Sequence, residues 1–279
     1  MIEFIYIICI VLLAAASWTD LKTHEVPDWI NYSGIFAGLG LRLIWSLYSF
    51  DWSFILEGIA GFGAFLGVGV VLFYLGQWGG GDSKLLMALG ALLGLKLSFT
   101  HITVLFLANL VIVGGAYGFA WSVGLALLNY KKFKIRFRKK LDSFKRLRLI
   151  IVLFSVFLIV LAFFTQESFL RLLFIFMAVL VPFMNYLIIG VKSVEDVCMY
   201  SRVKPKDLTE GDWIAKDVFV KGKKICGPKD LGIEKKQIRQ LIKAKIKSVV
   251  VRTGIPFVPS FFIAFLITLW IGSPLAFLL

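Results

Sequence analysis

Two aspartates stand where an apolar chain accommodates charge least easily. Asp20 directly follows the first hydrophobic run, and Asp82 ends the cluster Gly79-Gly80-Gly81-Asp82 that opens another. An aspartate inside the hydrocarbon costs on the order of 3 kcal/mol, so its presence there usually has a functional reason. Two neighbouring carboxylates cannot easily both ionise, so one holds a proton while the other can activate water for attack on a carbonyl. Such a pair is suited to acid–base hydrolysis.

The elements that carry these residues belong to a membrane protein. Of the 279 residues, 59% are hydrophobic and only 17% are charged, and the mean hydropathy is +0.87. These values lie outside the range of soluble globular domains, and the 27 Phe and 25 Gly are typical of closely packed, lipid-facing helices. The composition therefore predicts a polytopic membrane protein.

Helices that cross a hydrocarbon core of about 30 Å need about 20 apolar residues. The first run lacks a basic start and is followed by Trp18-Thr19-Asp20 instead of a cleavage site, so we expect a retained helix. The eight candidate runs are 2–18, 30–49, 54–77, 83–98, 101–128, 149–165, 169–191 and 256–277. The fourth run is short and the fifth is long, so the number of membrane spans can be six to eight.

The distribution of Lys and Arg predicts the orientation. If the N-terminus lies outside, 28 of the 31 basic residues fall on the cytoplasmic side and only Arg42, Lys96 and Arg171 do not. Topology and attraction to anionic membrane lipid then account for the net charge of +14, and no nucleic acid is expected as a partner. We expect a multi-pass protein of the cell membrane.

This topology puts Asp20 and Asp82 on one membrane surface, where each has a structural alternative to consider. Asp82 precedes a predicted helix and is a suitable N-cap. Asp20 lies at a helix C-terminus, where the helix dipole disfavours an anion by about 0.3 to 1 kcal/mol, so capping does not explain it. From spacing alone, a paired functional role and separate structural roles both remain open.

Three stretches together carry a family resemblance. They are S-W-T-D-L-K-T-H-E-V-P-D-W-I-N at 17–31, G-G-G-D-S-K-L at 79–85 and G-I-P-F-V-P at 254–259. The chain resembles the type IV prepilin peptidases, which are membrane aspartyl proteases of the GxGD type, and is most similar to the archaeal branch that processes preflagellins and prepilins. GxGD alone is a weak motif, but its combination with the other two stretches is specific.

The resemblance implies roles for individual residues. It makes Asp20 and Asp82 the catalytic dyad, with Gly79, Gly80 and Gly81 giving the backbone freedom for a peptide to approach. We expect Lys84 to tune the dyad or contact substrate, or else to extend from the interface into water.

The loop that follows Asp20 supplies weaker candidates. Pro27 should turn the chain before the second helix, where Asp28 is the expected N-cap, and Glu25 should be solvated.

The chain departs from many bacterial members of this family. Their long first cytoplasmic loop carries paired CxxC motifs for zinc, whereas nine residues separate Asp20 from Ile30 here. Cys9, Cys198 and Cys226 are too scattered for a four-ligand zinc site. We expect no metal and no cofactor, and peptidase activity without methylation.

The predicted fold class is a membrane all-α helical bundle of about eight transmembrane helices, with a small cytoplasmic α+β domain inserted before the last helix. In that domain we expect strands over 213–220 and 247–252, a turn at 221–223 and a helix over 234–246. The basic linker should be an interfacial amphipathic element or a flexible loop. The predicted domains are a catalytic bundle at 1–128, the linker at 129–148, a helix pair at 149–191, the soluble domain at 192–255 and a final helix at 256–279.

The predicted function is removal of the basic leader, a class III signal peptide, from prepilin or preflagellin-like precursors at the cytoplasmic membrane face. One alternative is a deeper intramembrane protease related to signal peptide peptidase, in which the first aspartate would stand mid-helix. A transporter or a non-enzymatic assembly subunit is another. A transporter is expected to show internal repeats and acidic residues near the midplane, and neither is evident.

Overall fold

Long apolar helices dominate the computed structural model, which describes residues 2–96, 98, 100–220, 222–230 and 232–272. Within these residues, five helices are long and apolar enough to cross a membrane. They are α1 (Ile2–Thr23), α3 (Ser53–Tyr74), α5 (Ile102–Leu128), α7 (Lys145–Phe164) and α8 (Ser168–Cys198). The protein is thus a mainly helical membrane protein.

The expected count of eight spans is not confirmed. Helix α2 (Asp28–Ser49) is long but less apolar, and α10 (Val258–Ile271) is a shorter apolar helix. Helix α4 (Gly80–Leu93) has 14 residues, which gives a length of about 21 Å, less than a hydrocarbon core of about 30 Å. The last predicted span runs to 277, and its part beyond 272 lies outside the described residues.

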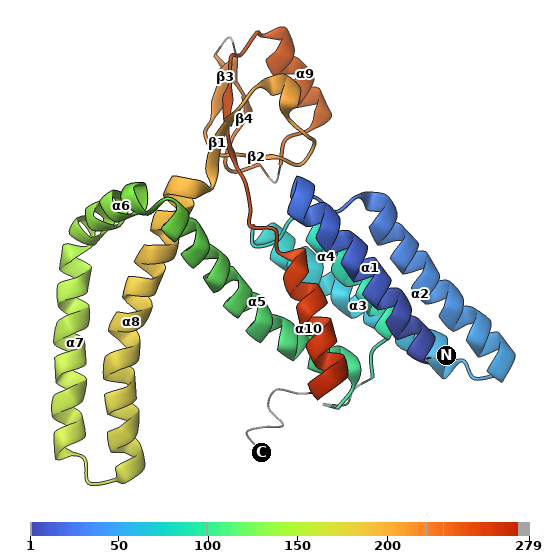
Figure 1. Ribbon diagram of the computed structural model, residues 1–279, viewed down its shortest axis with the longest axis horizontal. Coiled ribbons are helices and arrows are strands. Elements are labelled where there is room, and N and C mark those ends of the chain that lie inside the picture. Colours follow the sequence, from blue (N-terminus) through green and yellow to red (C-terminus); the bar gives the residue numbers. More distant parts are fainter. Residues whose placement is uncertain (1, 97, 99, 221, 231, 273–279) are drawn as a thin grey trace. The chain divides into compact units, whose positions relative to one another are not determined.

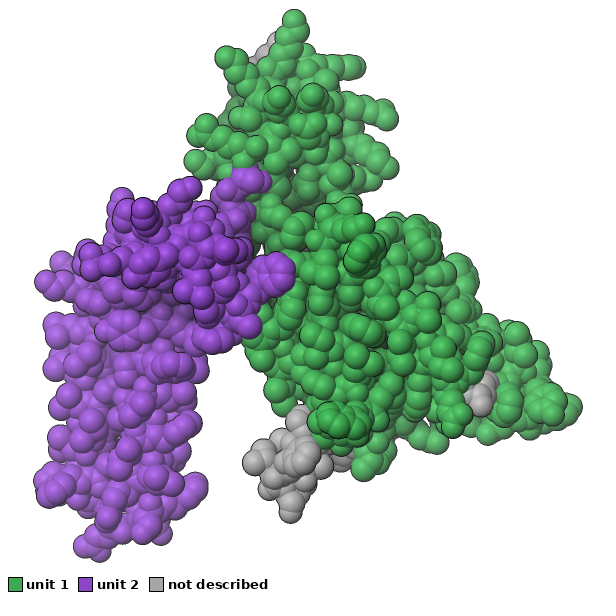
Figure 2. Space-filling model, viewed as in Figure 1, with its two compact units in different colours: residues 1–118, 202–279 green, residues 119–201 purple. Residues whose placement is uncertain are grey.

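Two compact units divide the chain (Figure 2). Unit 1 comprises residues 1–118 and 202–279, and unit 2 comprises residues 119–201. Both predicted catalytic aspartates belong to unit 1, which also contains residues 202–255 of the predicted soluble domain.

Helix α4 is the central helix of unit 1, with α1, α2 and α3 around it (Figure 1). From Leu85 to Leu93 every residue except Met87 is buried. Side chains of α1, α3, α5 and α10 complete the same core, including Leu13, Phe65, Phe106 and Phe261. Because protein surrounds α4, its short length leaves little of its backbone to lipid.

Glycines let α2 and α3 approach α4 closely. A Cβ at Gly34 would lie 2.9 Å from the Cβ of Ala88, and one at Gly38 would lie 2.7 Å from the backbone nitrogen of Leu92. Gly61 of α3 and Gly90 of α4 are closer still, because a Cβ on either would meet the carbonyl oxygen of the other. Such small-residue contacts are a common basis of helix association in membranes.

We expect Gly61→Ala to destabilise unit 1 by about 1 to 3 kcal/mol, because the new methyl group would collide with backbone atoms of α4 that cannot move independently. Thermal unfolding in a mild detergent measures this effect. Gly63→Ala is the matched control, since a Cβ at Gly63 meets nothing within 4 Å. Equal midpoints for the two variants would contradict the close packing of α3 on α4.

A buried arginine holds the C-terminal end of α4. Arg42 of α2 is 3% exposed, and its Nε and Nη2 donate to the carbonyl oxygen of Leu92 at 3.1 and 3.0 Å. Its Nη1 donates to the carbonyl of Phe54 at 2.8 Å. Gly94 ends α4 with a φ of 70°, and a Cβ there would lie 2.6 Å from Arg42 Nη2. The guanidinium thus satisfies the carbonyl of Leu92, which the end of α4 leaves unpaired, and also binds the carbonyl of Phe54 in the first turn of α3.

Unit 2 consists of α6 (Tyr130–Ser143), α7 and α8, with the C-terminal part of α5. The basic linker is therefore largely helical, and α7 begins at Lys145, four residues earlier than expected. Helix α8 continues to Cys198, seven residues beyond the predicted span. It contains Pro182, which it tolerates within one continuous helix.

The segment predicted to form a soluble domain contains both strands and a helix, as expected. Strand order in the three-stranded sheet is β1-β5-β2, and β3 pairs with β4 in a second, antiparallel pair. A buried cluster that includes Ile214, Leu241 and Val251 joins the sheet to α9. The bounds are β1 Tyr200–Val203, β2 Trp213–Ile214, β3 Val218–Val220, β4 Lys223–Cys226, α9 Lys235–Lys243 and β5 Val249–Arg252.

The strand prediction was incomplete. The alternating stretch 213–220 contains two strands, because the backbone leaves the first sheet after Ile214 and joins the β3–β4 pair at Val218. Strands β1 and β4 were not predicted, since they are short and mostly exposed. The predicted turn includes Gly222, with a φ of 78°, while Lys221 lies outside the described residues.

Candidate active site

Asp20 is a buried carboxylate in the last turn of α1. Only 5% of the residue is exposed, and the helix continues to Thr23. The N–H of Val258, the first residue of α10, donates to Asp20 Oδ2 at 2.9 Å. Asp20 therefore caps the N-terminus of a helix far away in sequence. The expectation that capping does not explain Asp20 is wrong in this respect, because it considered only the helix that carries the residue.

Asp82 is the third residue of α4, not its N-cap. The helix begins at Gly80 with Gly79 as the N-cap, and Asp82 Oδ2 accepts the backbone N–H of Gly79 at 3.1 Å. A carboxylate in this position reaches back to an N–H group that the first turn leaves unpaired. Asp82 is less buried than Asp20.

The ends of α1 and α4 that carry the two aspartates lie together. The loop after α1 packs on the first turn of α4, since a Cβ at Gly81 would lie 3.3 Å from both the nitrogen and the Cβ of Val26. Asn31 Nδ2 also donates to the carbonyl of Gly81 at 3.4 Å. The arrangement can hold two interacting carboxylates beside one loop.

The glycines before Asp82 do not need unusual backbone angles. None of Gly79, Gly80 and Gly81 has a positive φ. Gly81 instead supplies the close approach of α4 to Val26, where a side chain would press on the backbone of the neighbouring loop.

Helix α2 starts one residue earlier than predicted, at Asp28 and not after it. Pro27 has a φ of −59° and occupies the N-cap, so Asp28 is the first helical residue and not the cap. Lys84 Nζ lies 2.6 Å from Asp28 Oδ1, and this ion pair joins the first turns of α2 and α4. Lys84 is therefore paired with Asp28 on a partly exposed surface.

Aromatic rings lie next to the backbone that holds Asp20. Trp78, directly before the glycine cluster, has its ring centroid 5.2 Å from that of Phe261 and 5.9 Å from that of Phe257. A Cβ at Gly114 would lie 2.7 Å from the ring of Phe257. The stretch 254–259 was part of the predicted motif, but neither these rings nor the Val258 N–H was predicted to belong to the site.

The soluble domain touches the loops that follow α1 and α3. Thr209 Oγ1 donates to Glu25 Oε1 at 2.6 Å, so Glu25 is exposed but not solely solvated. A Cβ at Gly76 would lie 3.7 Å from the ring of Trp213. Gly76 lies six residues before Asp82, and Glu25 five residues after Asp20.

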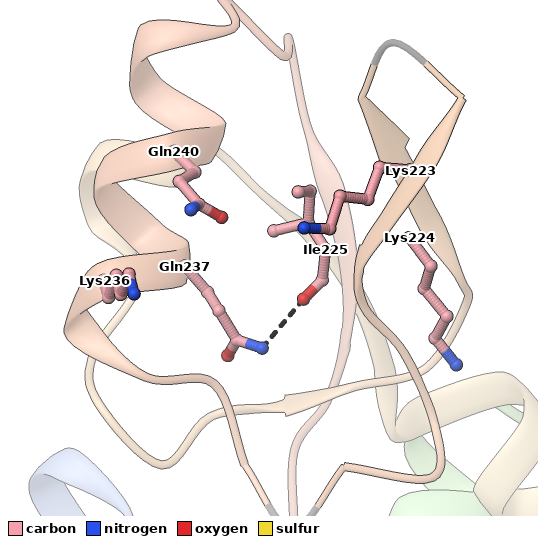
Figure 3. A pocket seen from close by; sticks show the side chains of 6 residues that line it. All are labelled: Lys223, Lys224, Ile225, Lys236, Gln237 and Gln240. Atoms are coloured by element: carbon pink, nitrogen blue, oxygen red, sulfur yellow. Dashed lines mark hydrogen bonds between the residues drawn. The ribbon is translucent and has the colours of Figure 1, made fainter.

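The other candidate features lie apart from the aspartates. Among the described residues, no group of three or more His, Cys, Asp or Glu is placed to hold a metal ion. Figure 3 shows a pocket of the soluble domain in which Gln237 Nε2 donates to the carbonyl of Ile225 at 2.8 Å. None of its lining residues is a predicted site residue; they are Lys223, Lys224, Ile225, Lys236, Gln237 and Gln240.

Comparison with known proteins supports the family resemblance over the part of the chain that carries both aspartates. Residues 7–119 match the model of the type IV leader peptidase family. A segment of 88 residues is 38% identical to the preflagellin peptidase of Methanocaldococcus jannaschii, and it covers 32% of this chain and 37% of that protein. No solved structure matches the chain significantly. The resemblance to prepilin and preflagellin peptidases is thus confirmed.

Proposed function

We propose that the protein is a membrane aspartyl endopeptidase that removes the leader from prepilin or preflagellin-like precursors at the cytoplasmic membrane face. The proposal is supported by the packing of the loop after α1, which follows Asp20, on the first turn of α4, which contains Asp82. Both residues lie within the segment that matches the leader peptidase family.

In the proposed reaction the two carboxyl groups share one proton. The ionised group takes a proton from a water molecule, whose oxygen attacks the carbonyl carbon of the leader junction. The protonated group donates its proton to the carbonyl oxygen. Collapse of the tetrahedral intermediate breaks the C–N bond. The departing nitrogen takes the proton that the first carboxyl group removed from water, and the second carboxylate regains a proton from a hydroxyl of the intermediate. The protonation states belong to the pair and not to either residue.

The neighbouring backbone positions the two groups. The Val258 N–H fixes one oxygen of Asp20, and the Gly79 N–H fixes one oxygen of Asp82. Held in this way, the carboxyl groups lose little conformational freedom when a substrate arrives, which lowers the entropic cost of the reaction. The substrate's apolar helix would lie in lipid and present its extended junction to the ends of α1 and α4.

The positions of the aspartates favour this function over the alternatives. Asp20 stands in the last turn of α1 and not in the middle, as a deeper intramembrane protease would require. A transporter that used them at different depths would not need the contact between the loop after α1 and the start of α4.

A cleavage assay tests the proposal. We expect the purified protein in lipid nanodiscs to cut a synthetic preflagellin-type precursor once, immediately before its apolar stretch, with product masses that show no added methyl group. The Methanocaldococcus jannaschii preflagellin peptidase serves as the positive control. The proposal fails if that enzyme cuts a panel of prepilin and preflagellin precursors while this protein leaves all of them intact.

We expect Lys84→Met to change the cleavage rate less than about threefold. Lys84 pairs with Asp28, whose side chain is 59% exposed, and exposed ion pairs contribute about 0 to 1 kcal/mol. The same cleavage assay measures the rate, and Asp28→Asn removes the other partner as a control. A loss of more than about tenfold in Lys84→Met alone would assign Lys84 to substrate binding or to the dyad instead.

A further inference from the structure

Helix α6 of unit 2 is rich in basic residues, and two of its aromatic side chains pack against each other and against α8. The rings of Phe133 and Phe137 stack with centroids 5.5 Å apart. A Cβ at Gly190 of α8 would lie 4.0 Å from the Phe137 ring. The apolar side of α6 therefore packs on α8 and not into lipid.

One carboxylate of α8 fixes how α6 is rotated. Asp196 Oδ2 lies 2.7 Å from Arg136 Nε and 2.9 Å from Lys140 Nζ, and Lys140 also donates to the carbonyl of Lys192 at 2.7 Å. These contacts use two of the basic residues of α6 and direct its remaining ones away from α8.

The remaining basic residues form one exposed surface, which we call the α6 cationic face. Helical periodicity puts them on the side opposite Phe133 and Phe137. Ile135 lies among them with 71% of its surface exposed. None has an acidic ion-pair partner within the ranges that the structure describes. The face consists of Lys131, Lys132, Lys134, Arg138 and Lys139.

This face borders a helix built for lipid. Helix α7 starts at Lys145, directly after α6, and is long and apolar enough to cross a membrane. Figure 1 shows α6 across one end of the α7–α8 pair. The cations next to the end of a membrane helix would lie at the depth of the lipid headgroups.

We infer that the α6 cationic face is a binding site for anionic phospholipid headgroups. The ammonium and guanidinium groups bind the phosphate oxygens, and Ile135 enters the apolar edge of the interface between them. An exposed isoleucine among cations suits a lipid, which offers both charge and hydrocarbon, better than an acidic peptide or nucleic acid. The inference is independent of the proposed peptidase activity.

Native mass spectrometry of the full-length protein tests this inference. The protein in a neutral detergent is titrated with phosphatidylglycerol or phosphatidylcholine, and bound lipids are counted. The test variant replaces the five basic residues of the α6 cationic face by Gln. The matched control removes the same charge from exposed positions of the soluble domain, as K229Q/K236Q/K243Q/K245Q/K247Q. Ile135→Asp is a second, single-site test that brings a negative charge into the face.

We expect wild type and the control to bind phosphatidylglycerol at least about tenfold more tightly than phosphatidylcholine, and both α6 variants to lose this preference. Retention of the preference by both α6 variants would overturn the inference. So would an equal loss in the control, which would make net charge the cause. Full competition by inorganic phosphate or by an acidic peptide at the same concentration would assign the face to a soluble ligand instead.

Discussion

Replacement of either Asp20 or Asp82 by Asn is expected to lower leader cleavage by at least about 10³-fold while precursor binding is retained. Asparagine has nearly the shape of aspartate, and its side-chain oxygen can still accept the N–H of Val258 or Gly79. It cannot exchange a proton with water or with the peptide. The variants should therefore lose the chemical step and keep the fold, which single-turnover cleavage and thermal unfolding measure together.

Asp28→Asn and Glu25→Gln are the matched controls for this prediction. Both carboxylates belong to the same loop region as Asp20, but one pairs with Lys84 and the other accepts a hydrogen bond from Thr209. We expect each control to keep its cleavage rate within about threefold of the wild type, since exposed ion pairs and hydrogen bonds contribute little. Near-normal cleavage by Asp20→Asn or Asp82→Asn would show that the hydrolysis does not use that carboxylate.

The second large effect is expected for Arg42→Met. The substitution removes three hydrogen bonds to the carbonyls of Leu92 and Phe54 and leaves the Leu92 carbonyl at the end of α4 unpaired, at a cost of about 2 to 4 kcal/mol. Arg42 holds the end of α4 opposite to Asp82. We therefore expect both a lower unfolding midpoint and slower cleavage, with Arg42→Lys intermediate because one ammonium cannot replace the bidentate fork.

Arg171→Met controls for the loss of an arginine. Arg171 also donates through Nε and Nη2 to one backbone carbonyl, that of Thr165, but at an exposed position. We expect its unfolding midpoint to stay close to that of the wild type. If Arg42→Met also unfolded at the wild-type temperature, Arg42 would not be an anchor of α4.

The sequence predicted which residues stand near the end of α1 and the start of α4, because their signals are local. The predicted spans, 2–18 and 83–98, nevertheless differ from the observed Ile2–Thr23 and Gly80–Leu93. A carboxylate after an apolar run and a glycine cluster before another are visible without the fold. The hydrogen bond from Val258 to Asp20 could not be predicted from local sequence signals, because it joins residues 238 positions apart. The stretch 254–259 was noted as a motif, and the structure adds a physical role for it.

Arg42 shows what the charge pattern could have revealed. It was counted only as one of three basic residues on the outer side. An arginine within an apolar run is costly unless it has partners, so its presence predicts a buried acceptor. Which acceptor could not be predicted, because the carbonyl of Leu92 becomes available only where α4 ends, and the periodicity of the run 83–98 extends beyond that end.

The boundaries of the predicted domain elements were least predictable where elements are short. Strands β2 and β3 have two and three residues, so their alternation could not be distinguished from that of a single strand over 213–220. The helix in the basic linker was one of two alternatives. The partners that stabilise it, Asp196 and the α8 surface near Gly190, lie about 60 residues away in the chain.

Single-turnover cleavage by the double variant Asp20→Asn/Asp82→Asn, measured beside the two single variants, shows whether the two carboxyl groups act together. If the carboxyl groups act as one dyad, removing the second adds nothing to removing the first, so all three variants lose the same factor. Losses that multiply in the double variant, or a single variant with near-normal turnover, would contradict a shared catalytic role for Asp20 and Asp82.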